Sequence, residues 1–123
     1  MIVANFKANG NSSFILKWHE EFIQAASESI FSSVGVAPSH IHFYKLNKLF
    51  KETSVRLGMQ NIDEEGGART GSISAEMASE IGCSFLILGH SERRIFYNEN
   101  NNNIKNKIQI SLSLIHISEP TRQ

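Results

Sequence analysis

Two short apolar runs of this sequence end in residues that can do proton-transfer chemistry. Asn5 and Lys7 close the first run (MIVANFK), and His90 and Glu92 follow a later run (SFLIL) within the stretch Gly-His-Ser-Glu-Arg-Arg. A lysine offers a point charge to a phosphate or a developing oxyanion. A histidine at a helix start is favoured in its neutral form, because the helix amides place partial positive charge beside it. Neutral imidazole can then donate an N–H to a substrate carbonyl and move protons between adjacent oxygens.

Each of these residues also has an ordinary structural interpretation. Alone, Lys7 fits a solvated loop lysine, Asn5 a turn or capping residue, and His90 a histidine that bonds only to its own loop. The stretch GGARTG, residues 66–71, resembles a phosphate-cradling loop but lacks the lysine-serine ending of a P-loop. The paired arginines after Glu92 fit either phosphate ligands or structural ion pairs. The elements that position these residues therefore decide between the interpretations.

Short apolar strands alternate with amphipathic helices along the chain. The predicted strands cover residues 1–6, 33–37, 55–62 and 84–88. The predicted helices cover residues 12–29, 41–51 and 74–81, and a fourth opens near Ser91 or Glu92 and continues irregularly past the asparagine run 100–103. The predicted inner faces carry Phe14, Trp18, Phe22 and Ala25 in the first helix and Leu46, Leu49 and Phe50 in the second.

This alternating order predicts an α/β fold with a parallel sheet covered by helices. Two closures fit the pattern equally: a doubly wound open sheet, or part of a (β/α)₈ barrel. Both place function at the C-terminal ends of the strands. Asn5, Lys7, Gln60, Asn61 and His90 all fall at such ends, so we expect them to gather at one rim of the sheet.

Composition narrows the class of protein. The 123 residues carry 12 basic and 12 acidic side chains, a balance that argues against a nucleic-acid or anionic-membrane partner. The single cysteine, Cys83, cannot form an internal disulfide and suits a reducing compartment. We find no secretory signal and no apolar window long enough to span a bilayer. A cytoplasmic globular domain is the expectation.

Four motifs together resemble the triosephosphate isomerase family. They are ANFKANG at residues 4–10, LGMQN at 57–61, GARTGSIS at 67–74 and LILGHSERR at 86–94, in the order and spacing of that family. The resemblance implies the N-terminal half of a (β/α)₈ TIM barrel with four βα units, in which residues 1–110 form the partial barrel. It argues against a different phosphosugar-binding barrel, because another chemistry would not need this set of residues.

The resemblance also implies roles for individual residues. Asn5 and Lys7 match substrate contacts, and Lys7 matches the lysine that stabilises negative charge on the substrate. His90 matches the electrophile that polarises the carbonyl, with Ser91 and Glu92 as supporting residues beside it. Gln60 and Asn61 match supports for the site, and Thr70 lies in the loop that reaches into the partner of a homodimer. The implied reaction interconverts dihydroxyacetone phosphate and glyceraldehyde 3-phosphate, with no cofactor and no metal.

Two positions depart from the family pattern. Phe6 replaces the usual tryptophan, which is a tolerable aromatic exchange. Ser72 stands where a glutamate usually follows Thr-Gly and pairs with the first arginine of the SERR motif, here Arg93. We therefore expect Arg93 to lack a partner and the geometry of the dimer loop to change.

The chain also lacks parts that the family's chemistry needs. No Tyr-Glu-Pro segment supplies the general base, and the only Glu-Pro, Glu119-Pro120, has the wrong context. Residues 112–122, LSLIHISEPTR, resemble a translated sequencing-library adapter, so residues 111–123 are predicted to be an artefactual tail in which His116 has no function. We expect an isomerase fragment that is inactive alone. The alternative is a non-catalytic half-barrel that binds phosphate or self-associates.

Overall fold

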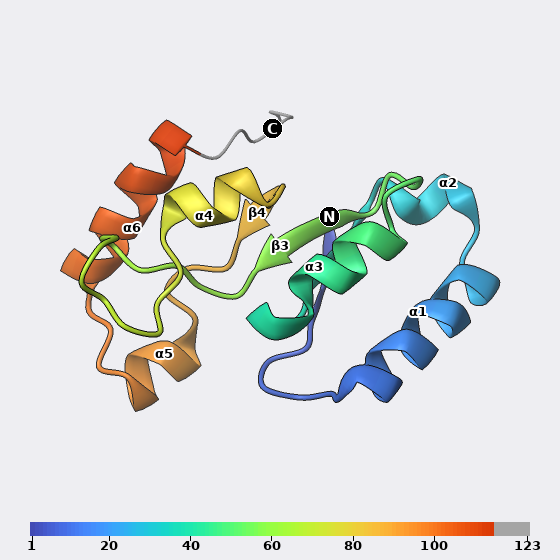
Figure 1. Cartoon of the computed structure of the whole chain (residues 1–123), viewed down its shortest axis with the longest axis horizontal. Helices are drawn as coiled ribbons and strands as arrows, with labels where there is room; N and C mark the ends of the chain where they lie inside the picture. The colour runs from blue at the N-terminus through green and yellow to red at the C-terminus, as the bar shows by residue number, and fades with distance from the viewer. Residues whose placement is uncertain (115–123) are drawn as a thin grey trace. The chain divides into compact units, whose positions relative to one another are not determined.

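The computed structural model describes residues 1–114 of the chain, and the chain divides into a first unit, Met1–Gln60, and a second unit that begins at Asn61 (Figure 1). The elements, in chain order, are β1 (Ile2–Asn5), α1 (Ser12–Ala25), α2 (Glu28–Phe31), β2 (Val34–Ala37), α3 (His40–Leu49), β3 (Arg56–Met59), α4 (Ala75–Glu80), β4 (Phe85–Leu86), α5 (Ser91–Phe96) and α6 (Asn101–Leu114). Four strands alternate with helices, which confirms the predicted α/β class and is consistent with the N-terminal half of a TIM barrel.

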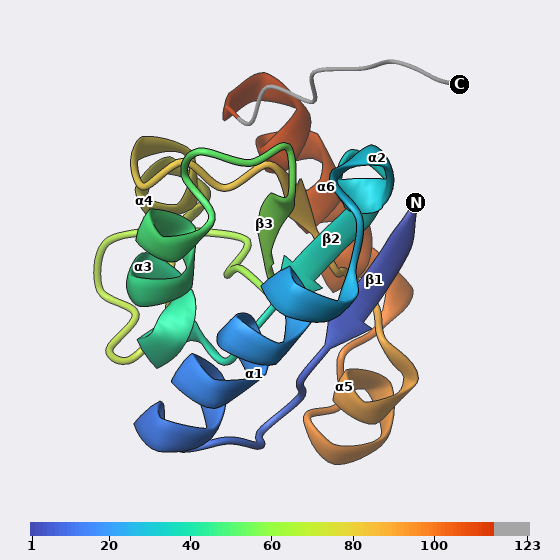
Figure 2. The same ribbon diagram turned by 90° about the vertical axis from the view of Figure 1, so that its right-hand side faces the viewer.

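The first unit contains a parallel sheet in which β2 lies between β1 and β3 (Figure 2). Asn5 pairs with Ala37, and Val36 pairs with Leu57. Val36, Ala37 and Leu57 are almost completely buried, as expected for strands of a parallel sheet that helices cover. Because the strands are parallel, their C-terminal ends emerge at one edge of this sheet.

Helices α1 and α3 pack against each other in the first unit, and α3 contacts β3. The inner stripe of α1 runs through Ile15, which is buried, and through the half-buried Trp18 and Phe22. The prediction was wrong for Phe14 and Ala25, which are both exposed. The stripe is shifted by one residue because Ile15 takes the core position, while Phe14 makes only an edge contact with another aromatic ring.

Aromatic rings fill the space between α1 and α3. Trp18 stacks on Phe22 with centroids 5.3 Å apart, and both rings meet Phe50 edge-on at 6.1 and 5.9 Å. Phe50 and Leu46 are buried, as predicted for the inner face of α3. Edge-to-face and offset contacts at these distances are the favoured aromatic geometries, so the ring cluster holds α1 against the C-terminal end of α3.

Three predicted elements are markedly shorter in the structure, among them the strand predicted for residues 55–62, which covers only Arg56–Met59. The helix predicted for residues 12–29 ends at Ala25, because Ala26 and Ser27 adopt extended backbone before α2 begins. This break brings the buried Phe31 of α2 into a stacked contact with Phe22, 5.6 Å between centroids. The strand predicted for residues 84–88 is reduced to Phe85–Leu86.

The asparagine run starts a new helix, so the predicted single irregular helix is wrong. Helix α5 ends before Tyr97, and Asn98 adopts a left-handed backbone with φ of +55°. Asn100 and Asn103 then each accept a hydrogen bond from the other's backbone N–H, at 2.9 and 3.0 Å. This reciprocal pattern is that of a capping box, which satisfies free amides at a helix start.

Helix α6 packs against α4 in the second unit. The Ser79 hydroxyl donates to the Leu114 carbonyl at 2.7 Å, and Ala75 and Ala78 bury the inner face of α4. Residues 111–114 complete α6. The rest of the predicted tail, with His116 and Glu119, lies outside the described residues, so the division at residue 110 stays a prediction.

Candidate active site

Asn5 organises the backbone that carries Lys7. Asn5 is the last residue of β1, and its side-chain oxygen accepts the Lys7 backbone N–H at 3.0 Å. Lys7 itself has a left-handed backbone, φ +55°. That conformation costs a residue with a side chain about 1–2 kcal/mol, so the surrounding bonds must hold it. Asn5 therefore acts as a turn residue, and the same hydrogen bond places it beside Lys7.

Gln60 provides a second support for Lys7. Its amide nitrogen donates to the Lys7 carbonyl at 2.9 Å and to the Ala37 carbonyl at 3.0 Å. Ala37 is the last residue of β2, so one side chain beyond β3 ties the end of β2 to the segment after β1. The first unit thus brings Asn5, Lys7 and Gln60 together.

His90 is the N-cap residue of α5, and its ring bonds back to the helix. Its Nδ1 accepts the backbone N–H of Glu92 at 3.1 Å. An acceptor nitrogen carries no hydrogen, so in the neutral ring the hydrogen lies on Nε2. The ring is partly exposed, at 29% of its side chain, and Nε2–H is therefore available as a donor.

Gly89 places His90 at this helix start. Its φ is +71°, and a Cβ at this position would lie 2.9 Å from Cδ1 of Ile104 on α6. The backbone angle strains any residue with a side chain here, and the terminal methyl of Ile104 would have to shift to make room for one. In the sequence Gly89 stands out only as part of the motif, and no sequence signal points to Ile104.

Ser91 and Glu92 occupy the first turn of α5 beside His90. Ser91 is exposed, and the Glu92 carboxylate lies 3.6 Å from Nδ1 of His90 with 43% of its side chain exposed. A carboxylate in the first helical turn also interacts favourably with the helix dipole. The second unit thus holds His90, Ser91 and Glu92 in one short segment.

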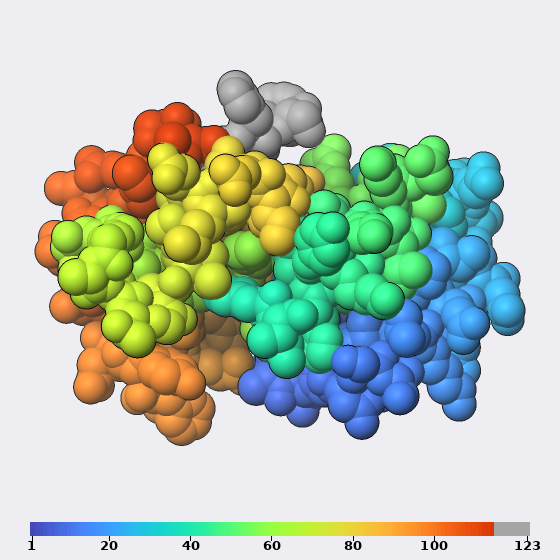
Figure 3. All heavy atoms as spheres, in the orientation of Figure 1, coloured from blue at the N-terminus to red at the C-terminus, as the bar shows by residue number. Residues whose placement is uncertain are grey.

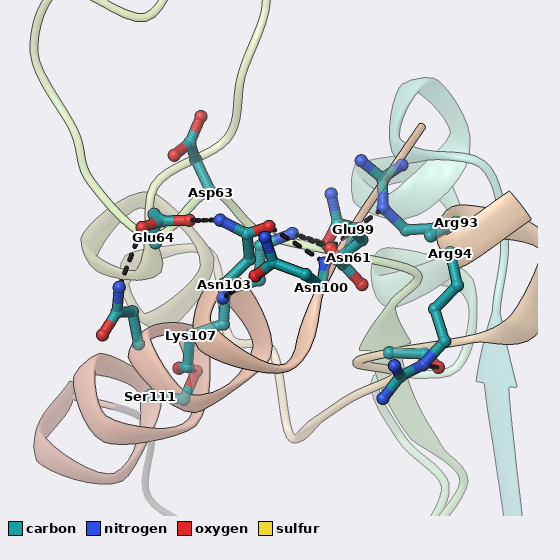
Figure 4. A network of polar contacts seen from close by, with 12 residues as sticks. Asn61, Asp63, Glu64, Arg93, Arg94, Glu99, Asn100, Asn103, Lys107 and Ser111 are labelled. Atoms are coloured by element: carbon teal, nitrogen blue, oxygen red, sulfur yellow. Dashed lines mark hydrogen bonds and ion pairs between the residues drawn. The ribbon is translucent and has the colours of Figure 1, made fainter. Parts of the chain in front are cut away.

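Arg93 has a partner, which corrects the expectation from Ser72. Its Nε lies 3.4 Å from the Glu99 carboxylate, and its guanidinium stacks over Tyr97 at 4.6 Å. Glu99 also binds the ammonium group of Lys107, and these two side chains are 3% and 7% exposed (Figure 4). Burial opposes ionisation of Glu99, but the hydrogen bond and charge of Lys107, with the charge of Arg93, hold its pKa below the usual range.

Ser72 instead belongs to the glycine-rich loop before α4. Its hydroxyl hydrogen-bonds to the Asp63 carboxylate, which together with the charge of Arg69 lowers the pKa of Asp63. Arg69 pairs with Glu65 inside the loop. Thr70 is exposed, and the loop forms part of the surface of the second unit (Figure 3). Contacts between side chains of the loop itself therefore stabilise it, although the glutamate usual in the family is replaced by Ser72.

A second tether of this loop was missed by sequence reasoning. Glu64 accepts amide N–H groups from Asn103 and Asn106 of α6, at 2.8 and 2.9 Å (Figure 4). The Lys107 ammonium donates to the side chain of Asn61 at 2.8 Å. The signal available in the sequence was the helical spacing of Asn103, Asn106 and Lys107, which places these side chains on one face of α6.

Three findings concern the predicted site and its surroundings. Within residues 1–114, no group of three or more metal-ligating side chains is close enough to hold a metal ion, and no helix is long and apolar enough to cross a membrane. Asn5 and Lys7 lie in the first unit and His90 in the second. Their gathering at one rim stays a prediction.

Comparison with known proteins gives a consistent result. A family model described as "Triosephosphate isomerase" matches residues 1–117. Proteins named triosephosphate isomerase from Methylococcus capsulatus, Dictyoglomus thermophilum and Francisella tularensis subsp. novicida are 37%, 34% and 36% identical to this chain, over 82%, 89% and 88% of its length. The matched segments cover 40%, 44% and 43% of those proteins, so the chain spans less than half the length of these relatives.

The matched region contains the Asn5–Lys7 turn, the glycine-rich loop and the His90 helix start. Because the family match covers almost the whole chain and the fold agrees with it, this chain belongs to the triosephosphate isomerase family.

Proposed function

We propose that the protein to which this chain belongs is a triosephosphate isomerase, which interconverts dihydroxyacetone phosphate and glyceraldehyde 3-phosphate in the cytoplasm. The observation that supports this most directly is the hydrogen bond from Glu92 N–H to Nδ1 of His90. It leaves an N–H on Nε2, which is the form of the ring that can polarise a substrate carbonyl. A neutral histidine at a helix start is the established electrophile of this family.

The proposed chemistry is two proton transfers through an enediolate. A base removes a proton from the carbon beside the carbonyl while Nε2–H of His90 stabilises the oxygen that gains negative charge. His90 then moves a proton between the two oxygens, and the base returns its proton to the neighbouring carbon. Lys7 stabilises the negative charge of the phosphorylated substrate and of the enediolate. Atoms and electrons balance without an added reductant or oxidant.

The base is not among the residues of this chain that match the family. In the family it is a glutamate of a Tyr-Glu-Pro segment, and residues 1–123 hold no such segment. We therefore propose that the 123-residue chain alone is inactive, and that the complete protein forms a homodimer through the loop carrying Thr70.

A chimera tests the isomerase proposal directly. Residues 1–110 would be joined to the part of the M. capsulatus relative that follows its matched segment, and isomerisation of glyceraldehyde 3-phosphate would be followed in a coupled assay. We expect turnover by the chimera, none above background by the 123-residue chain, and a loss of about 10²–10⁴ in kcat on His90→Gln. A folded chimera whose rate is unchanged by His90→Gln would remove His90 from the mechanism.

The alternative is a non-catalytic half-barrel that self-associates. It is supported by the exposed apolar residues of β1, Ile2 at 75% and Val3 at 38%, since exposed sheet surfaces favour association. It predicts a defined dimer of the 123-residue chain in analytical ultracentrifugation and binding of inorganic phosphate. Aggregation, or a monomer that does not bind phosphate, would count against it.

A further inference from the structure

A buried histidine of α3 hydrogen-bonds to the loop that carries Lys7. His42 is 7% exposed, and its Nε2 lies 2.9 Å from the carbonyl oxygen of Gly10. A carbonyl can only accept, so the ring nitrogen is the donor and carries a hydrogen. The two residues are 32 positions apart in the sequence, so this bond joins α3 to the β1–α1 loop within the first unit.

Gly10 lies close to the first turn of α1. Its φ is +98°, and a Cβ there would lie 3.2 Å from Ile15 and 3.3 Å from Phe14. The next residue, Asn11, caps α1 by accepting the Phe14 N–H at 2.8 Å. The loop end at Gly10 is thus a tightly placed piece of backbone, and its carbonyl bond to His42 sets the direction of the chain there.

The other end of the segment is held by a different side chain. Gln60 donates to the Lys7 carbonyl at 2.9 Å, and Asn9 donates to the Phe6 carbonyl at 3.2 Å. Gln60, just after β3, therefore holds residues 7–10 at Lys7, and His42 of α3 holds them at Gly10. Between these two supports Lys7 keeps its left-handed backbone.

We propose that His42 is a positioning residue for Lys7, which acts by holding the Gly10 carbonyl and so the backbone of residues 7–10. The part of the proposal that concerns substrate rests on the proposed function. A buried polar ring would be unfavourable in the core without a partner, and the Gly10 carbonyl supplies that partner. Gly10 is exposed, so removal of the donor would leave its carbonyl to water and take away the bond that ties the loop to α3.

Two substitutions of similar length separate the hydrogen bond from packing. His42→Gln keeps an N–H donor at a similar distance from the backbone, whereas His42→Met fills the same space with no donor. His19→Met is the matched control, because the His19 ring is also partly buried in this unit and its Nε2 has no hydrogen-bond partner among the described residues. Thermal unfolding of each variant identifies any that fails to fold.

The first measurement is amide hydrogen exchange of residues 7–11 in the 123-residue chain. We expect exchange of the Lys7 amide to rise at least about 10-fold in His42→Met, with His42→Gln and His19→Met within about threefold of the parent. Equal protection in His42→Met and His42→Gln would overturn the proposal, and so would an equal rise in His19→Met. If His42→Met fails to fold, unchanged protection in His42→Gln supports the proposal and lost protection overturns it.

The second measurement is kcat and KM of the same variants in the chimera. We expect kcat/KM to fall by about 10- to 100-fold in His42→Met and to recover in His42→Gln, because a displaced contact group loses rate steeply. An active chimera whose kcat/KM is unaffected by His42→Met would overturn the role toward substrate. An inactive parent chimera would contradict the proposed function instead, and the exchange result would still decide whether His42 holds the loop.

Discussion

The backbone N–H of Glu92 donates to Nδ1 of His90 at 3.1 Å, so the helix that His90 begins also selects the tautomer of its ring. The first residue of the helix, Ser91, separates the two partners in sequence and points its own side chain to solvent. The bond is local, because all the atoms it needs come from three consecutive residues. Any chain that starts a helix at this histidine in this rotamer would reproduce it.

This geometry predicts the tautomer of His90 in solution. We expect the neutral ring to carry its hydrogen on Nε2, because Nδ1 is occupied as an acceptor. Long-range ¹⁵N–¹H correlation spectra of the 123-residue chain distinguish the two neutral forms by the nitrogen shifts. Assignment of the signals by His90→Gln is the control, and a ring with its hydrogen on Nδ1 would contradict the hydrogen bond.

A side chain at Gly89 is predicted to lower the free energy of unfolding. Gly89→Ala adds a strained backbone of about 1–2 kcal/mol and an overpacking cost of about 1–3 kcal/mol against Ile104. Gly67→Ala is the matched control, because Gly67 has a similar φ of +80° but a Cβ added there would meet no atom within 4 Å. Urea unfolding should show the larger loss for Gly89→Ala, and equal losses would mean that the Ile104 side chain moves aside at little cost.

Charge removal at Glu99 is predicted to destabilise the second unit. Glu99→Gln leaves the buried Lys107 without its carboxylate, and loss of one partner of a buried ion pair costs about 3–5 kcal/mol. The double substitution Glu99→Gln with Lys107→Met removes both buried charges and should recover much of this stability. The free energy of unfolding in urea measures both effects. Equal stability of the single variant and the parent would show that the pair is not buried in solution.

Stability is also predicted to fall in acid through Glu99. Its pKa in the folded chain lies below the ordinary glutamate value of 4.5, so its contribution is fully present above that value and is lost as the pH falls through the lowered pKa. Asp63 and Glu64 have lowered pKa values as well and act in the same direction. The urea midpoint, measured at pH values from about 7 to about 3, should fall once the pH is below 4.5, the ordinary pKa of glutamate. This fall should be smaller in Glu99→Gln. If the urea midpoint of Glu99→Gln depends on pH as strongly as that of the parent, the acid effect does not come from Glu99.

Local sequence was sufficient for most elements of the fold. The three strands of the first unit, helix α3 and the loop before α4 all follow from apolar runs, helical spacing and glycine positions, because those signals act over a few neighbouring residues. The same is true of the Asn5–Lys7 turn and the start of α5, whose hydrogen bonds join residues two apart. The predicted inner face of α1 was nevertheless displaced by one residue, because Ile15 and not Phe14 enters the core.

The sequence by itself determined the class of fold and the family, and it made Asn5, Lys7 and His90 the candidate site residues, because each inference rests on local patterns. Only the tertiary structure decided which distant groups hold them. Gln60 supports Lys7 from 53 residues away, and His42 bonds to Gly10 from 32 residues away. Lys107 of α6 pairs with Glu99, the carboxylate that also contacts Arg93, which was expected to lack a partner. Such bonds depend on how strands and helices pack, and a linear pattern does not specify the meeting of side chains on different elements.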